Sequence, residues 1–190
     1  MQLSESALAA ARLIDRIERL TRSGVPLHGL NPAQWDALRY LARANRFSRS
    51  PAALAAFLGS TRGTVSQTLI ALEQKGFVSR CASDRDRRSV ALDLTEKGMA
   101  ALDADPLLAL AADVATATGG DADAVVALLE EVLRAAVRRN GGRAFGVCHT
   151  CRHFRRDGGE GGAGPHYCAL LKEPLSVDDS GRICVEQEAA

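Results

Sequence analysis

The chain has 190 residues, of which 46% are apolar and 25% charged, and its formal net charge is +1. This composition is typical of a globular protein and excludes a long disordered chain. No apolar run approaches the roughly 20 residues that a membrane-spanning helix needs. The N-terminal segment carries acids as well as arginines, so we expect neither a signal peptide nor a transit peptide, and a cytoplasmic location.

The near-zero net charge conceals a basic region. Residues 31–90 hold ten Lys or Arg against four Asp or Glu, whereas the chain from residue 147 onward holds five basic and seven acidic residues. Concentrated basic charge attracts the phosphate backbone of nucleic acids. We therefore expect double-stranded DNA to bind the first of these regions and not the tail.

Residues 1–30 predict an amphipathic helix that contributes to a dimer. Leu8, Leu13, Ile14 and Ile17 supply its apolar side chains. Together with the later helices, this helix offers more apolar surface than one small domain can bury. The sequence therefore predicts helix packing between two protomers of a homodimer.

Residues 50–76 predict a helix-turn-helix. Ser50 and Pro51 form a favourable helix start, because serine accepts from free amides of the first turn and proline has no amide to satisfy. Gly59 can adopt the left-handed conformation that ends this helix, and Ser60 or Thr61 can cap the next one. Two short helices at a steep angle are the expected result.

The second of these helices is the expected recognition helix. Val65, Leu69 and Leu72 recur at helical spacing and should face the core. The candidate DNA contacts lie on its other faces: Arg62, Thr64, Ser66 and Gln67, with Ile70 beside them. Arginine suits guanine and glutamine suits adenine in the major groove.

Two strands predict a wing after the recognition helix. Residues 77–81 and 89–94 have strand patterns and are joined by Asp84-Arg85-Asp86-Arg87-Arg88. Arg85, Arg87 and Arg88 can enter a minor groove or neutralise phosphates, while the aspartates brace the turn. A solvated charged turn is the alternative, but its place directly after a helix-turn-helix favours DNA binding.

The segments LNPAQWDALRYLAR and DRDRRSVALDLTEKG, with the two helices between them, resemble the winged-helix core of MarR-type transcriptional regulators. The resemblance covers about residues 5–140, and its most specific part is the wing, around Asp86-x-Arg88 and LTEKG. It implies a homodimer on a pseudo-palindromic operator. Such a regulator is usually a repressor that a small-molecule or redox effector relieves.

Two further helical segments follow the wing. Pro106 should break the segment 95–118, with Asp105 as the boundary, because proline removes a backbone hydrogen bond and clashes with the preceding turn. Residues 121–139 form the clearest helix, which Asp121 can cap. Gly119-Gly120 and Gly141-Gly142 act as joints.

Four of the five cysteines lie in the last 43 residues, at Cys148, Cys151, Cys168 and Cys184. In a reducing compartment, Cys-x-x-Cys followed by two more thiols favours a metal site over disulfides. Zinc is preferred as the metal that proteins use most often in such sites. The spacing also resembles that of small high-potential iron-sulfur proteins, so a [4Fe-4S] cluster is the alternative, although the tail lacks the Gly-Trp before their last cysteine.

Other cysteine and histidine residues carry weaker signals. His166 is a substitute ligand or a partner of one, because it lies two residues before Cys168. His149 and His153 flank the first cysteine pair and are expected to be surface residues. Cys81, in the first wing strand, matches no metal spacing and is interpreted as a small strand residue.

These observations predict a mostly α fold with a small β-wing, and four parts. The parts are an N-terminal dimerisation helix (1–30), a winged helix-turn-helix domain (31–98), C-terminal dimerisation helices (99–142) and a Cys-rich metal-binding module (143–190). The predicted function is DNA-binding transcriptional regulation, not catalysis, since no phosphate loop or nucleophile-base pair is evident. The alternatives are a thiol-redox or iron-sulfur protein whose tail is the main activity, and a tail that is an interaction module on a DNA-bound dimer.

Overall fold

The computed structural model describes residues 3–23, 27–82, 90–159 and 164–190. Its helices are α1 (Glu5–Arg22), α2 (Pro32–Arg43), α3 (Pro51–Leu58), α4 (Arg62–Gln74), α5 (Glu96–Leu102), α6 (Leu107–Ala117), α7 (Asp123–Arg139) and α8 (Val177–Gly181), with the short 3-10 helices η1 (Leu27–Gly29) and η2 (Cys148–Thr150). Its strands are β1 (Val78–Ala82), β2 (Val90–Leu94), β3 (Phe154–Arg155), β4 (His166–Cys168) and β5 (Glu173–Leu175). The mostly helical fold with a small β-wing confirms this part of the predicted fold class.

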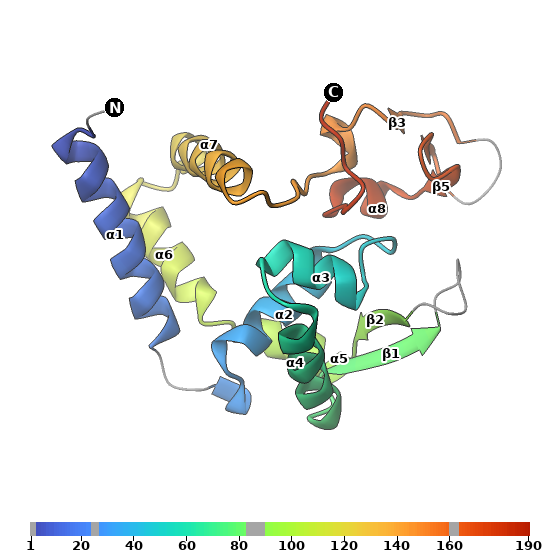
Figure 1. The fold of residues 1–190 in the computed structure, drawn as a ribbon, viewed down its shortest axis with the longest axis horizontal. Coiled ribbons are helices and arrows are strands. Elements are labelled where there is room, and N and C mark those ends of the chain that lie inside the picture. Colours follow the sequence, from blue (N-terminus) through green and yellow to red (C-terminus); the bar gives the residue numbers. More distant parts are fainter. Residues whose placement is uncertain (1–2, 24–26, 83–89, 160–163) are drawn as a thin grey trace.

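Three parts are visible in Figure 1. We call α2 to α5 with β1 and β2 the winged-helix core, α1 with α6 and α7 the helical arm, and residues 143–190 the cysteine module. The arm extends to one side of the core, and the cysteine module lies over α3 on another. None of the described helices is both long and apolar enough to cross a membrane.

The helix ends of the winged-helix core follow local signals in the sequence. Asn31 forms a capping box with Gln34 at the start of α2. Ser50 accepts from the amide of Ala53 at the start of α3, and Gly59 ends that helix with a φ of 59°. These caps satisfy first-turn amides and allow the sharp reversal into the next helix.

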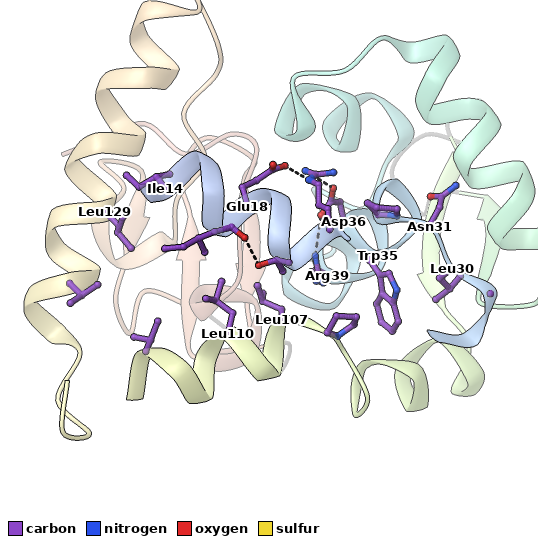
Figure 2. A pocket seen from close by; sticks show the side chains of 18 residues that line it. Ile14, Glu18, Leu30, Asn31, Trp35, Asp36, Arg39, Leu107, Leu110 and Leu129 are labelled. Carbon is purple, nitrogen blue, oxygen red and sulfur yellow. Dashed lines mark hydrogen bonds and ion pairs between the residues drawn. The ribbon is translucent and has the colours of Figure 1, made fainter. Parts of the chain in front are cut away.

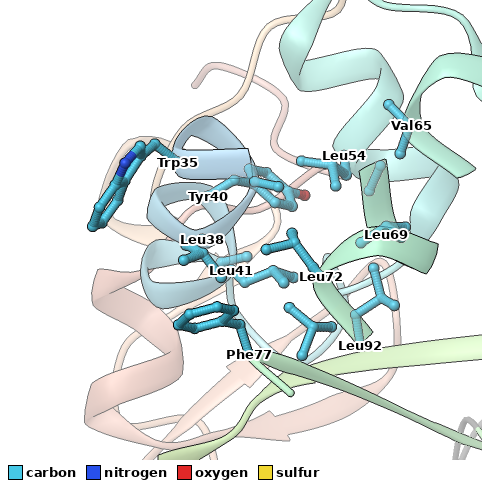
Figure 3. Packing of buried hydrophobic residues seen from close by; sticks show 14 of the residues in the cluster. Trp35, Leu38, Tyr40, Leu41, Leu54, Val65, Leu69, Leu72, Phe77 and Leu92 are labelled. Carbon is cyan, nitrogen blue, oxygen red and sulfur yellow. The ribbon is translucent and has the colours of Figure 1, made fainter. Parts of the chain in front are cut away.

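The winged-helix core is built around one apolar cluster (Figure 3). Leu38 and Leu41 of α2 pack with Leu69 and Leu72 of α4, and Leu92 of β2 closes the cluster from the wing side. All five are at most 1% exposed. Full burial of a leucine side chain stabilises the folded state by about 1.5 to 3 kcal/mol. This cluster therefore fixes the position of α4.

The helical arm differs from the core because none of the residues of α1, α6 and α7 is buried. The helix is interrupted before Pro106, as predicted. The first part, α5, ends at Leu102, before the expected boundary at Asp105. Helix α7 begins at Asp123, and Asp121 accepts from the amide of that residue at 3.1 Å. The cap residue is thus one position later than predicted, with Asp121 bracing the first turn.

The cysteine module contains a three-stranded antiparallel sheet in the order β3-β4-β5. Phe154 pairs with Cys168, and Cys168 with Glu173. The sequence pattern does not predict these strands, which are only two or three residues long. Alternation over so few residues gives no period-two signal.

Candidate nucleic-acid interface and cysteine module

Helix α4 presents a polar N-terminal face to solvent. Thr61 caps it by accepting from the amide of Thr64 at 3.1 Å. Val65, Leu69 and Leu72 are at most 2% exposed and hold the opposite face against the core. Of the predicted DNA contacts, Arg62, Thr64 and Gln67 are exposed, and Ser66 is half-buried. The helix therefore has the amphipathic arrangement that a recognition helix needs.

The wing strands β1 and β2 pair in antiparallel register, with Val78 opposite Leu94 and Ala82 opposite Val90. The strands are fixed to the rest of the core: the Arg49 guanidinium pairs with Asp93 at 2.7 Å. The wing tip, with the predicted contacts Arg85, Arg87 and Arg88, lies outside the described residues. Cys81, on β1, is exposed, with its sulfur 3.6 Å from an oxygen of Asp93.

Part of the basic charge counted in residues 31–90 is used inside the protein. Arg39 pairs with Asp105 at 2.5 Å. Arg46 lies 3.4 Å from Asp179 in the cysteine module. The positive excess available to DNA is therefore smaller than the sequence count, and Arg62 is the exposed arginine of α4.

A cavity of about 680 Å³ lies between the helical arm and α2 (Figure 2). Its walls are mainly apolar, with Ile14 of α1 and Leu110 of α6 opposite Trp35 of α2. The polar exceptions include Asp36 and Arg39, joined at 3.2 Å. An apolar cavity with a few charged groups is the usual form of a small-molecule site.

The same ion-pair network joins the arm to the core. Arg39 Nε donates to Asp105 at 2.8 Å, and the amide of Leu107 donates to Asp105 at 2.8 Å. Burial works against ionisation of Asp105, but these two partners outweigh it and lower its pKa. Asp105, in turn, raises the pKa of Arg39. The pair is therefore ionised at neutral pH and anchors the start of α6 to α2.

The four tail cysteines converge from separate segments. Cys148 lies in η2, Cys151 follows it, and the amide of Cys151 donates to the Cys148 carbonyl at 2.9 Å. Cys168 lies on β4, and Cys184 donates its amide to Gly146 at 2.8 Å. The segments that carry the four thiols are thus brought together by the fold.

Burial and neighbouring thiols favour the neutral form of Cys148. The pKa of Cys148 is raised to about 12, first by burial and then by the nearness of Cys184, Cys168, Cys151 and Asp179. Several thiolates this close would repel one another unless a cation neutralised them. As placed, however, the described Cys, His, Asp and Glu side chains form no group of three or more that could hold a metal ion. A metal site here therefore requires the thiols to draw closer.

The histidines of the cysteine module have distinct surroundings. His166 is 9% exposed, and its Nδ1 accepts from the amide of Asp157 at 3.2 Å. His153 Nε2 lies 3.1 Å from a carboxylate oxygen of Glu188, and His149 packs edge-on against Phe154. His166 is thus better buried than a surface histidine, whereas His149 is exposed as expected.

The sequence does not predict the contact between the cysteine module and the core. Ile183 and Val185 join the apolar cluster of the core, and Phe145 stacks edge-on with Tyr40 and Phe57. The residues that receive the tail lie at the end of α2, in α3, and in the loop between them, which resembles an ordinary polar loop. No single-sequence signal marks such a loop as a docking site, because the pairing joins segments more than 130 residues apart.

Comparisons with known proteins find relatives of the region that carries α2 to α4 and the wing. Residues 28–89 match the model described as the MarR family. The transcriptional repressor MprA of Escherichia coli strain K12 is 39% identical over 70 residues, which are 37% of this chain and 40% of MprA. The family match is limited to residues 28–89, less than half of the chain.

Two solved structures extend the likeness beyond residues 28–89. The regulator BldR from Sulfolobus solfataricus is 25% identical, with a TM-score of 0.56 over 73% of this chain and 99% of BldR. The repressor CouR bound to a 23-mer DNA duplex is 26% identical, with a TM-score of 0.53 over 70% of this chain and 99% of CouR. The chain spans about 40% of the length of the curated relative that it matches. The family match ends at residue 89, before the cysteine module begins, so the module lies outside that match.

Proposed function

We propose that this protein is a sequence-specific DNA-binding transcriptional regulator, acting as a repressor. The carrying observation is helix α4, whose buried stripe leaves Arg62, Thr64 and Gln67 exposed at its N-terminal half. The N-terminal residues of a recognition helix are the ones that reach base edges. The likeness to MprA and to DNA-bound CouR supports this assignment.

The regulator is proposed to act as a homodimer on a pseudo-palindromic operator. Exposed leucine and isoleucine side chains cover the helical arm, including Leu13 and Leu20 of α1 and Leu128 and Leu133 of α7, which are 62% to 65% exposed. Apolar surface of this extent is covered in a stable protein, and a two-fold partner covers it with the same helices. Sedimentation of a dimer at micromolar concentration is expected, and a monomer would contradict it.

The experiment that tests DNA binding is selection of duplexes from random-sequence DNA by the purified protein. A two-fold related pair of half-sites about one helical turn apart is expected. The wing arginines are then tested on the selected duplex: Arg87→Ala and Arg88→Ala should each lower the slope of log affinity against log salt by about one. Recovery of no preferred sequence would contradict the regulator, and unchanged salt slopes would contradict the wing assignment alone.

We infer that the cysteine module holds a metal through Cys148, Cys151, Cys168 and Cys184, with His166 as a substitute ligand. Convergence of the four segments and the suppressed ionisation of Cys148 support this inference. Zinc is the proposed metal, and a [4Fe-4S] cluster is the alternative. Metal analysis and a visible spectrum of protein purified without oxygen distinguish them: colourless stoichiometric zinc, or brown protein with iron and sulfide. Finding neither zinc nor an iron-sulfur cluster would contradict the site. That result would favour thiol redox chemistry or an interaction role for the tail.

The cavity beside α1 favours a small-molecule effector as a second input. Its apolar walls with the Asp36–Arg39 pair fit an apolar ligand that carries one polar or charged group. Such a ligand would act on the joint between the arm and the core. A ligand of this kind that abolishes operator binding of the wild type, but not of Trp35→Ala, would support this role.

A further inference from the structure

A short strip of backbone pairing ties the cysteine module to the end of α2 and the loop that follows it. The amide of Ile183 donates to the Arg43 carbonyl at 2.7 Å, and the amide of Asn45 donates to the Ile183 carbonyl at 2.9 Å. The next residue of the tail, Cys184, donates its amide to the Gly146 carbonyl at 2.8 Å, which joins this segment to the entry of the module. The module thus binds a carbonyl that the end of α2 would leave without a helical partner.

Buried side chains close the same contact. Ile183 and Val185 join the apolar cluster of the core and are at most 9% exposed. Ser48, in the loop between α2 and α3, is 0% exposed. Its Oγ accepts from the amide of Val185 and donates to Asn45 Oδ1, each at 2.8 Å. The contact between module and loop is therefore part of the interior of the protein.

The loop between α2 and α3 also holds the wing and the start of α3. The carbonyl of Arg49 accepts from the amide of Leu92 in β2 at 2.9 Å, and the Arg49 guanidinium pairs with Asp93 at 2.7 Å. Ser50, the last residue of the loop, caps α3, which turns directly into α4. A shift of this loop would therefore move the wing or α3 relative to α4.

We propose that the cysteine module is a clamp that positions the wing and α3 for DNA, with Ser48 as the positioning residue through which it acts. A helix-turn-helix and its wing bind one duplex together only when their mutual arrangement matches its grooves and phosphates. The loop between α2 and α3 sets part of this arrangement, and the module is bonded to that loop. The inference rests on the DNA-binding role proposed above, and it does not require a metal in the module.

Hydrogen exchange of the full-length protein tests the link between module and wing without DNA. The amide of Leu92 is the reporter, because it donates to the Arg49 carbonyl. Ile183→Ala removes an apolar side chain from the contact and should raise the exchange rate of this amide about tenfold. Val177→Ala, at a branched residue of the module that is 68% exposed, is the control and should leave the rate unchanged. An equal increase at the amide of Leu72 in α4 would indicate global unfolding and contradict a local link.

Operator affinity tests the consequence for DNA, on the duplex selected above. Ser48→Ala removes the hydroxyl that joins the loop to Val185, and the variant should bind about fivefold more weakly. The slope of log affinity against log salt should also fall by about one, because a displaced wing loses a phosphate contact. Ser180→Ala is the matched control, since Ser180 is also 0% exposed and its Oγ donates to the Val177 carbonyl within the module. It should keep the affinity and the slope of the wild type.

The salt slope separates positioning from a simple loss of folded protein. A variant that is only less stable has a smaller binding-competent fraction, which lowers its apparent affinity by the same factor at every salt concentration. Its slope stays that of the wild type, and this result for Ser48→Ala would contradict the clamp. Circular dichroism at each salt concentration checks that the folded fraction is constant.

The outcomes distinguish the clamp from the regulator on which it rests. If the wild type selects no duplex, the regulator proposal fails and the DNA role of the clamp fails with it, while exchange at Leu92 still reports on the contact. If the wild type binds DNA and Ser48→Ala keeps its affinity and slope, the clamp alone is overturned. The clamp is also overturned if Ile183→Ala leaves the amide of Leu92 as protected as in the wild type.

Discussion

The winged-helix core and the cysteine module are ordered by different means. In the core, α3 and α4 begin at side-chain caps and pack through leucines that are at most 2% exposed. In the cysteine module, the longest helix has five residues, and the strands have two or three. Part of the order of the module comes from Ile183 and Val185, which join the core cluster.

Because of this difference, substitutions in the two regions should have different effects on the stability of the whole protein. A region with its own apolar cluster folds by itself, whereas a short, loop-rich segment needs cross-links or a neighbouring surface. We therefore expect substitutions in the core to affect unfolding of the whole protein. Equivalent substitutions in the module should mainly affect the contact with the α2–α3 loop and, if the proposed site holds, metal binding.

The largest expected effect comes from a cavity in the core. Leu69→Ala should lower the free energy of unfolding by about 3 kcal/mol, because the removed side chain is fully buried. Leu170→Ala in the cysteine module, where the leucine is 42% exposed, should cost less than about 1 kcal/mol. Urea unfolding followed by circular dichroism measures both. Equal losses would contradict the division between the two regions.

The next effect compares two glycines. A Cβ on Gly98 would lie 2.1 Å from the Phe77 carbonyl oxygen, whereas a Cβ on Gly181 would meet nothing within 4 Å. Gly98→Ala must therefore move α5 from the wing strand and should destabilise by about 2 kcal/mol, in the range of overpacked cores. Gly181→Ala in α8 should be neutral or slightly stabilising. Thermal unfolding measures both variants. A melting temperature of Gly98→Ala equal to that of the wild type would contradict this prediction.

The third effect concerns the joint between arm and core, and it depends on pH. Asp105→Asn should cost about 1.5 to 2 kcal/mol at pH 7, since a hydrogen bond to a charged group is lost. The folded-state pKa of Asp105 is lowered, so its stabilisation is present above the unfolded value of about 3.9 and disappears as the pH falls through the folded value.

The pH dependence supplies the check on this third prediction. The stability difference between wild type and Asp105→Asn should be constant from pH 7 to about pH 5 and shrink below about pH 4. Asp103→Asn, two residues earlier and exposed, is the control and should match the wild type at each pH. A difference that grew on acidification would have the wrong sign.

The smallest effect compares two helix caps. Ser50 accepts from Ala53 at the start of α3, and Ser176 accepts from Asp179 at the start of α8. Ser50→Ala should lower the global stability by about 1 kcal/mol. Ser176→Ala should leave global unfolding nearly unchanged and increase amide hydrogen exchange within the cysteine module. Exchange confined to the core in that variant would show that the module is not a separate unit.

The sequence was sufficient for the features of the core that depend on neighbouring residues. Ser50, Gly59 and Thr61 lie at the ends of helices as predicted, because a cap and a left-handed glycine act over one turn. Val65 and Leu69 face the core because their spacing matches the helical period. Arg62 and Gln67 are exposed at the predicted face, although their contact with DNA stays a prediction.

Features that depend on distant segments could not be predicted in this way. Arg46 counts as basic charge in the sequence, but it lies beside Asp179 of the tail. Asn45 and Ser48 read as loop residues, and their burial depends on the docking of Ile183 and Val185. Pairing across such separations leaves no periodic pattern in either segment.

The central claim, that α4 reads DNA, is tested most directly by the affinity of Arg62→Ala for the selected duplex. We expect a loss of about 1 to 3 kcal/mol together with relaxed preference at one base position of each half-site. Arg156→Ala, an exposed arginine of the cysteine module, serves as the matched control and should bind as the wild type. Unchanged affinity and unchanged base preference for Arg62→Ala would contradict the account.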